Sequence, residues 1–443
     1  MSASAKSRQS SPKPLPAPSF EIVHHKLDNG LRVVLAPDRS APVVGVAVLY
    51  DVGFRSEPEG RTGFAHLFEH LMFQGSGNLE KLEHMRYVES SGGMFNGSTH
   101  FDYTNYYEAL PSNALERGLF LEADRMRGPR ITEENLANQL DVVKNEIRVN
   151  VMNTPYGGFP WIYLPAVLFD TFANSHNGYG GFEDLESATT DDARDFFRRY
   201  YAPGNAVLAV AGDLDVDGTL ALVDEHFGAI KRRAVPKRPD FGEPPLSGER
   251  RDTHQDERAP LPAVAIGYRV PDPVRELDGL LAVLLLAELL GDGDAARLQR
   301  RLVQRDHLVT DVSVYVGEFG DPFDERDPTT LTVSAHYPDA KALDAILRAI
   351  DEELDSIADD GLDPGELDRV RTRLVSVLLR ELDAVISRTL EFAKFELLHG
   401  RAELIAELPV RLAAITEAEI RKAAGALRPD RRAVLELVAG GQQ

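Results

Sequence analysis

The segment GFAHLFEHLMFQGS, residues 63–76, places two histidines and a glutamate within five positions of an otherwise apolar run. If this segment is a helix, His66, Glu69 and His70 share one face, because residues three and four positions apart are neighbours on a helix. Two imidazoles one turn apart can both bind one Zn²⁺ through a ring nitrogen. The glutamate between them can then accept a proton from the attacking water. The pattern therefore predicts a hydrolytic zinc site with His66 and His70 as ligands and Glu69 as general base.

A catalytic zinc site needs one more protein ligand, with water in the fourth position. The chain has no cysteine, so this ligand must be a carboxylate or another histidine. The helical pattern at residues 135–152 offers Glu146, and Gln139 lies two turns earlier on roughly the same face. Spacing alone leaves three other carboxylates open as the third ligand: Glu133, Glu134 and Asp141.

The alternative interpretation of the histidine cluster is an ordinary packed helix. Three ionisable groups on one side of an apolar helix are costly to bury without a metal or polar partners. A chance match to H-x-x-E-H in a chain of this composition is expected on the order of a few hundredths of a time. Single histidines elsewhere are expected to be ordinary surface or core residues, namely His84, His100, His176 and His307.

Composition limits the function classes. The chain of 443 residues is 43% hydrophobic and 27% charged, and is too long for one hydrophobic core. Its formal charge of −22 argues against nucleic-acid binding, which needs a basic face. The apolar run at 280–290 is too short to span a membrane and predicts a buried helix. Residues 1–19 lack the apolar region of a secretory signal, and we expect a disordered tail on a cytoplasmic protein.

The cluster must be positioned by a mixture of strands and helices. Short β-branched runs bounded by Gly, Pro and Asn predict strands, and periodic apolar positions predict helices. We expect strands at 31–38, 41–53, 94–111 (a hairpin) and 205–213, and helices at 62–73, 79–92, 113–129, 132–152 and 215–228.

A weak internal duplication predicts two domains. Residues 233–259 are rich in Pro, Gly and charge, and we expect a linker there. It would join an N-terminal domain at 20–232 to a C-terminal domain at 260–440. Beyond the linker, the order of strand, long helix and final strand repeats, but the second long helix contains no histidine. Only the first domain is therefore expected to hold a metal.

The chain resembles the pitrilysin and mitochondrial processing peptidase family of zinc endopeptidases in its short-chain form. The resemblance extends from residue 20 to nearly the end, and its matching stretches include HLFEH, GGMFNGSTHFDYTNYYEALP, VVKNEI, PYGG and HFGAI. It implies an α+β fold of two homologous domains, each a mixed, mainly antiparallel sheet covered by helices, with one zinc ion per chain. The family's third zinc ligand is a glutamate at the spacing that separates His70 from Glu146, so the resemblance selects Glu146.

The resemblance also implies how a substrate binds. A peptide would add as a strand to a sheet edge beside the zinc, held by main-chain hydrogen bonds. The matching edge here suggests Asn96, Gly97 and Ser98 as backbone contacts. Many members have glutamate at the position of Gln139, where it supports the site.

Active single-chain members carry an arginine and a tyrosine in the second domain, and here Val303 and Thr310 stand at those positions. Arg301, Arg305 and Tyr315 are nearby but out of register. We therefore expect the zinc-bearing half of a heterodimer, whose homologous partner subunit supplies the arginine and tyrosine. The alternatives are a self-sufficient homodimer that uses Arg301 or Arg305, a non-catalytic structural or binding subunit, and a hydrolase of some non-peptide substrate.

Overall fold

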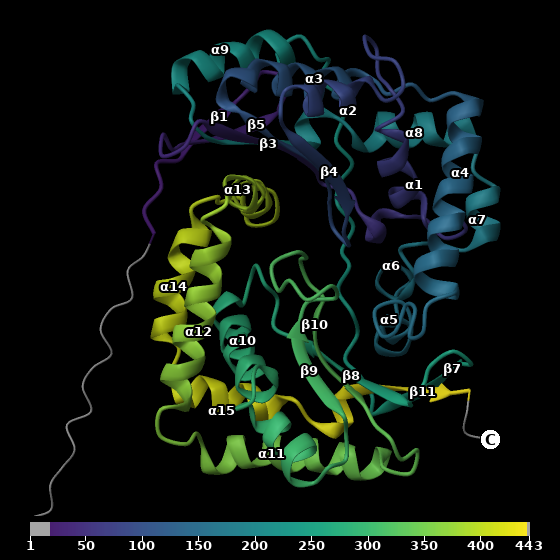
Figure 1. Ribbon diagram of the computed structural model, residues 1–443, viewed down its shortest axis with the longest axis vertical. Helices are drawn as coiled ribbons and strands as arrows, with labels where there is room; N and C mark the ends of the chain where they lie inside the picture. Colours follow the sequence, from purple (N-terminus) through teal and green to yellow (C-terminus); the bar gives the residue numbers. More distant parts are fainter. Residues whose placement is uncertain (1–17, 441–443) are drawn as a thin grey trace, which may run out of the picture.

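A computed structural model describes residues 18–440, so all but the last two positions of the predicted tail at 1–19 lie outside the described residues. The described part of the chain is α+β and has two domains, each built on one mixed sheet (Figure 1). The predicted fold class is confirmed. The domain limit at 232 stays a prediction.

The first sheet has the strand order β1-β2-β6-β3-β5-β4. Its strands are β1 (Val23–Lys26), β2 (Arg32–Pro37), β3 (Val43–Tyr50), β4 (Met94–Thr99), β5 (Thr104–Pro111) and β6 (Ala206–Gly212). The helices that accompany it are α1 (Phe64–Leu71), α2 (Glu83–Ser90), α3 (Leu115–Arg127), α4 (Glu133–Ile147), α5 (Leu164–Leu168), α6 (Phe172–Ser175), α7 (Phe182–Glu186), α8 (Thr190–Tyr200) and α9 (Val216–Phe227).

The second sheet has the strand order β7-β11-β8-β10-β9. Its strands are β7 (Arg250–Asp256), β8 (Ala263–Val270), β9 (Asp311–Val316), β10 (Thr329–His336) and β11 (Arg432–Ala439). The helices that accompany it are α10 (Leu277–Gly291), α11 (Leu343–Asp360), α12 (Glu366–Glu381), α13 (Val385–His399), α14 (Leu404–Ala414) and α15 (Glu417–Ala426).

The two sheets repeat one connectivity. In the first, β2 pairs in parallel with β6, and the remaining neighbours from β6 through β3 and β5 to β4 are antiparallel. In the second, β7 pairs in parallel with β11, and the neighbours from β11 through β8 and β10 to β9 are antiparallel. The duplication predicted from the order of elements is therefore present in the fold.

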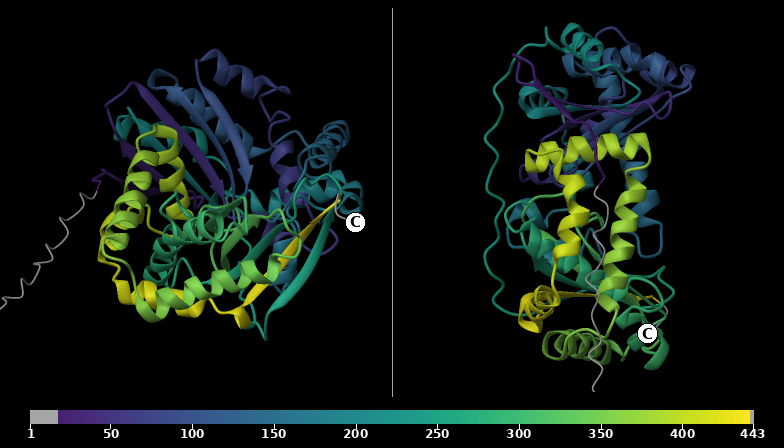
Figure 2. Two further views of the ribbon diagram at one scale, coloured as in Figure 1. Left: turned by 60° about the horizontal axis from the view of Figure 1, so that its bottom comes forward. Right: turned by 90° about the vertical axis from the view of Figure 1, so that its left-hand side faces the viewer.

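One expectation about the linker is wrong. The segment predicted as a linker at 233–259 contains β7, the counterpart of β2. Its sequence, RRDTHQD, has no apolar pattern, because an edge strand is held by main-chain hydrogen bonds and keeps its side chains exposed. The longest part of this segment without helix or strand is 233–249, and Figure 2 shows this stretch running along the outside of the molecule from one domain to the other.

One helix from each half of the chain packs on the sheet of the other domain. Helix α13, from the C-terminal half, packs on β3 and β6 of the first sheet, and α5, from the N-terminal half, packs on β8 and β11 of the second. The approach of α13 is close: a Cβ added to Gly45 of β3 would lie 2.3 Å from the Thr389 hydroxyl oxygen. These exchanged contacts bury apolar faces of both sheets and fix the two domains against each other.

Helix α10 contains the apolar run at 280–290, and the structure buries it in the core of the second domain as predicted. Its side chains face the core on nearly all sides, which explains the lack of an amphipathic pattern. Among residues 18–440, no helix is both long and apolar enough to cross a membrane.

Candidate metal centre and substrate cleft

The H-x-x-E-H segment forms α1, as predicted, and a buried carboxylate fixes the start of this helix. Gly63 precedes the helix with a φ of +79°, a backbone conformation that glycine tolerates best. The carboxylate of Glu57 accepts hydrogen bonds from the backbone N–H groups of Gly63, at 2.9 Å, and Ala65, at 2.7 Å. These are donors that a helix start leaves unpaired. The apolar side of α1 packs into the core through Leu67, Phe68 and Leu71.

Helix α4 brings Glu146 to the two histidines. Nε2 of His66 lies 3.7 Å from Oε1 of Glu146, and Nε2 of His70 lies 3.4 Å from Oε2. The two Nε2 atoms are 3.3 Å apart. Ligands bound to one tetrahedral zinc at about 2.0 to 2.1 Å are separated by about 3.3 Å, so these three side chains fit the ion. The carboxylates that spacing left open are exposed on other faces of α4: Glu133, Glu134 and Asp141.

The protonation of the cluster suits a cation. Burial lowers the pKa of His66 to about 4, so its imidazole is neutral, the form that binds metals. Burial also disfavours charge on His70, but its hydrogen bond with Glu146 and the nearby carboxylates outweigh this and raise the pKa of His70. The same hydrogen bond lowers the pKa of Glu146.

Glu69 lies on the same side of α1 as the histidines but is not among the three converging ligand atoms. The hydroxyl of Thr99, at the end of β4, donates a hydrogen bond of 2.6 Å to Oε2 of Glu69. Burial raises the pKa of Glu69. Its carboxylate is thus fixed in direction beside the metal ligands, as a general base needs.

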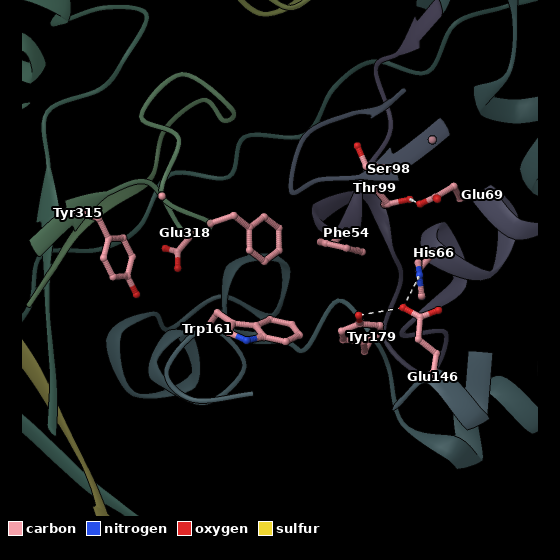
Figure 3. Close-up of a pocket in the computed structure, with 13 residues that line it drawn as sticks. Phe54, His66, Glu69, Ser98, Thr99, Glu146, Trp161, Tyr179, Tyr315 and Glu318 are labelled. Atoms are coloured by element: carbon pink, nitrogen blue, oxygen red, sulfur yellow. Dashed lines mark hydrogen bonds and ion pairs between the residues drawn. The ribbon is translucent and has the colours of Figure 1, made fainter. Parts of the chain in front are cut away.

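Sequence reasoning missed Tyr179, which contacts two of the predicted ligands. Its hydroxyl donates a hydrogen bond of 3.0 Å to Oε1 of Glu146, and its ring lies edge-on to His66 with centroids 5.0 Å apart (Figure 3). Burial and the Glu146 charge raise the pKa of Tyr179 to about 12, so it stays a donor. Tyr179 lies in the turn NGYGG, where no periodic pattern indicates the direction of a side chain.

Gln139 is placed where the sequence suggested. Its side chain is buried on α4 and hydrogen-bonds His70. It also donates a hydrogen bond of 2.9 Å to Oδ1 of Asn138. An amide is therefore able to orient the His70 ring without adding a charge.

The predicted substrate edge also lies beside the cluster. Strand β4 pairs with β5 on one side, and its other edge pairs with no strand among residues 18–440. Gly97 and Ser98 line a cavity of about 590 Å³ that also contains His66, Glu69 and Glu146. Asn96 is exposed and does not line the cavity; its side chain accepts a hydrogen bond from the Gly97 N–H group.

The second domain supplies the opposite wall of this cavity through residues at and after the end of β9: Tyr315, Glu318, Phe319 and Gly320. Tyr315 therefore reaches the cleft although it is out of the family's register. Arg301 and Arg305 do not line this cavity, and both form ion pairs with Asp306.

A second cluster of possible metal ligands is already neutralised by the protein. His84, Glu108 and Glu122 are buried together, and the guanidinium of Arg125 donates hydrogen bonds to both carboxylates. Since a cationic side chain occupies the centre of this cluster, it forms an internal ionic network. His84 is thus a satisfied core residue, as expected.

The chain is similar to known proteins along most of its length. Residues 32–159 match the family description "Insulinase (Peptidase family M16)", and residues 187–374 match "Peptidase M16 inactive domain". Zinc protease PqqE of Helicobacter pylori is 30% identical over 370 residues, which cover 81% of this chain and 79% of that protein. A crystal structure of a protease from Helicobacter pylori has a TM-score of 0.85 and 26% identity, covering 95% of this chain and 100% of that chain.

The chain is also similar to a protein that is not named as a protease. Subunit 1 of the bovine mitochondrial cytochrome b-c1 complex is 29% identical over 250 residues, covering 56% of this chain and 51% of that protein. The match to the zinc protease is longer and covers most of both chains.

Proposed function

Because the chain belongs to the M16 family of zinc proteases, we propose that it is a zinc endopeptidase whose metal is held by His66, His70 and Glu146. One observation carries the proposal: two imidazole nitrogens from one turn of α1 and a carboxylate from α4 converge to within 4.8 Å of one another. We expect one zinc ion per chain.

Each residue around the metal has a role in peptide hydrolysis. Zinc, when bound, would polarise the scissile carbonyl and make the attacking water more acidic. Glu69 would accept the water's proton at a carboxylate oxygen and pass it to the leaving amine. Thr99 holds Glu69 in place through its hydrogen bond. Tyr179 and Gln139 orient Glu146 and His70 in the same way.

The substrate would be an extended peptide or a short unstructured segment. The open edge of β4 can add one more strand through main-chain hydrogen bonds, and we assign Gly97 and Ser98 as its nearest contacts. Asn96 is the next residue along this edge and would contact a longer peptide. Because the cavity lies between the two domains, a compact folded protein would not reach the zinc ligands (Figure 3).

We also propose that the chain works with a homologous partner subunit. Val303 and Thr310 stand where the family's substrate-holding arginine and tyrosine are expected, and a second chain would supply both groups. We place such a heterodimer in the cytoplasm. Tyr315 favours the alternative of a self-sufficient homodimer, because it brings a tyrosine of this same sequence to the cleft. If the purified chain alone cleaves peptides at a rate that a homologous subunit does not raise, the heterodimer is wrong.

The experiment that tests the peptidase proposal compares wild type with Glu69→Gln. Metal content would be measured by elemental analysis and turnover with a quenched fluorescent peptide library. We expect about one zinc per chain in both proteins and a loss of turnover of at least roughly 100-fold in the variant. A binding or structural subunit would show no zinc-dependent turnover in wild type and no difference between the two proteins.

A further inference from the structure

The cleft contains a carboxylate that the proposed chemistry does not use. Glu318 lies in the loop after β9, lines the same cavity as the metal ligands, and is only 7% exposed. Its Oε1 atom has no hydrogen-bond partner among residues 18–440. A buried acceptor without a partner is costly, which points to a group that arrives with the substrate.

The neighbours of Glu318 do not neutralise it. The cationic group that acts on Glu318 is the guanidinium of Arg55. This group forms ion pairs with Asp102, at 2.9 Å, and with Glu325, at 3.5 Å. Glu318 forms no ion pair among the described residues, and none of the residues that line the cavity is lysine or arginine. Among the described residues, Glu318 therefore faces the cavity with no lysine or arginine side chain beside it there.

Aromatic rings connect the metal ligands to Glu318. The ring centroids of Tyr179 and Trp161 are 5.3 Å apart, and those of Trp161 and Phe319 are 6.0 Å apart. Phe319 is 43% exposed and lines the same cavity as Trp161 and Glu318, which are both labelled in Figure 3. Aromatic faces attract cations and also cover the apolar stem of a long basic side chain.

We propose that Glu318, Trp161 and Phe319 form a subsite for a lysine or arginine side chain of the bound peptide. The subsite rests on the proposed peptide-binding function of the cleft. The peptide main chain would lie on the β4 edge, whereas Glu318 is on the wall supplied by the second domain. A group that bridges the two walls needs a long apolar stem with a cation at its end. A lysine or arginine side chain has this shape, and a peptide's terminal amine does not.

Protonation of Glu318 agrees with this assignment. Burial raises the pKa of Glu318 to about 7, although Arg55 and the Thr330 hydroxyl act in the opposite direction. Near neutral pH, part of the protein would therefore hold this carboxyl group protonated. Binding of a cationic side chain would favour the carboxylate and release that proton to solvent.

The test uses Trp161, the single tryptophan of the chain, as a binding reporter within the subsite. The Glu69→Gln protein with its metal would be titrated with peptides blocked at both ends, which carry lysine, arginine or norleucine at one scanned position. At the best position we expect lysine or arginine peptides to bind roughly 10-fold tighter than the norleucine peptide, as for a charge-assisted hydrogen bond. Adding Glu318→Gln should reduce this preference to less than about 2-fold and leave norleucine binding unchanged.

Controls distinguish the effect of the Glu318 charge from the effect of removing a negative charge elsewhere on the protein. Glu59 is exposed and does not line the cavity, so adding Glu59→Gln should keep the full preference. If Glu318→Gln does not fold, Glu318→Asp keeps the charge but shortens the side chain, and it should lower the preference. Equal binding of lysine and norleucine peptides, or a preference that survives Glu318→Gln, would overturn the subsite. If only peptides with a free terminal amine discriminate, the site binds that amine and the side-chain assignment is wrong.

Because binding is measured without turnover, failure of the two proposals can be distinguished. A Glu318-dependent preference in a protein that hydrolyses no peptide would keep the subsite and refute the peptidase. Zinc-dependent hydrolysis without any preference for a basic residue would refute the subsite only.

Discussion

The hydroxyl of Tyr179 donates its hydrogen bond to the same oxygen of Glu146, Oε1, that lies 3.7 Å from Nε2 of His66. The tyrosine therefore contacts the predicted third ligand from outside the metal cluster. Its ring also packs edge-on against His66, so one side chain restricts two of the three ligands. Groups that orient ligands in this way hold the site ready for the ion.

We expect Tyr179→Phe to weaken zinc binding about 10-fold or more, because the ring stays and only the hydrogen bond is lost. Competition with a fluorescent chelator would measure the affinity. The control is Tyr87→Phe, which changes an exposed tyrosine of α2. An affinity equal to wild type in the Tyr179 variant would show that the hydroxyl does not support the site.

Thr99 connects the substrate edge to the general base, since it ends β4 and hydrogen-bonds Glu69. Thr99→Val keeps the shape and removes the donor, so we expect kcat to fall roughly 10-fold while zinc content stays at the wild-type level. Peptide hydrolysis and elemental analysis of the same sample would measure both. Thr253→Val, on the exposed edge strand β7, should change neither. Loss of zinc together with activity would assign Thr99 to metal binding instead.

Glu57 fixes the start of α1 through its bonds to Gly63 and Ala65, and it also contacts Nε2 of His176 at 3.0 Å. In Glu57→Gln, one of these donors would face an amide NH₂ group. We expect the free energy of unfolding to fall by about 1 to 3 kcal/mol. Denaturation in urea would measure it, with Glu59→Gln, at an exposed position two residues away, as the control. Equal stability of the two variants would contradict a role of Glu57 in capping.

Local patterns in the sequence were sufficient for α1 and for the helical position of Glu146, because helix periodicity fixes which side chains share a face. Periodicity did not choose Glu146 over Asp141, since the direction of α4 relative to α1 depends on packing between distant segments. Strand β7 was missed because an edge strand needs no apolar side chains. Tyr179 and Glu318 were missed because both lie in glycine-containing turns, NGYGG and GEFG, whose path is set by the contacts around them.

The packing of helices on the sheet of the other domain could not be predicted from the sequence either. Helix α13 covers the first sheet although it follows the second domain's strands β8 to β10 along the chain. The composition of α13 indicates a buried helix but not which sheet it covers. The duplicated order of strands could be predicted, whereas this exchange could not.

The buried network of Glu108, Glu122 and Arg125 predicts a dependence of stability on pH. One guanidinium faces two carboxyl groups, and burial raises the pKa of Glu122 to about 8, with Glu108 adding to the effect and Arg125 opposing it. The neighbouring Glu108 also has a raised pKa, chiefly because it is buried. The folded protein thus holds a proton that the unfolded chain, with an ordinary glutamate pKa near 4.5, has already released.

Because the folded state binds more protons between these two pKa values, the contribution of Glu122 to stability is lost as pH rises towards 8. His84 in the same network acts oppositely only below its ordinary pKa of 6.5, since burial lowers its pKa to about 3. Between pH 6.5 and 8, wild type should therefore lose up to about 2 kcal/mol more stability than Glu122→Gln, whose amide cannot ionise. Urea denaturation at several pH values would measure both proteins, with Glu89→Gln at an exposed position as the control. Parallel curves for wild type and Glu122→Gln would mean that Glu122 is already ionised in the folded protein and that Arg125 neutralises both carboxylates.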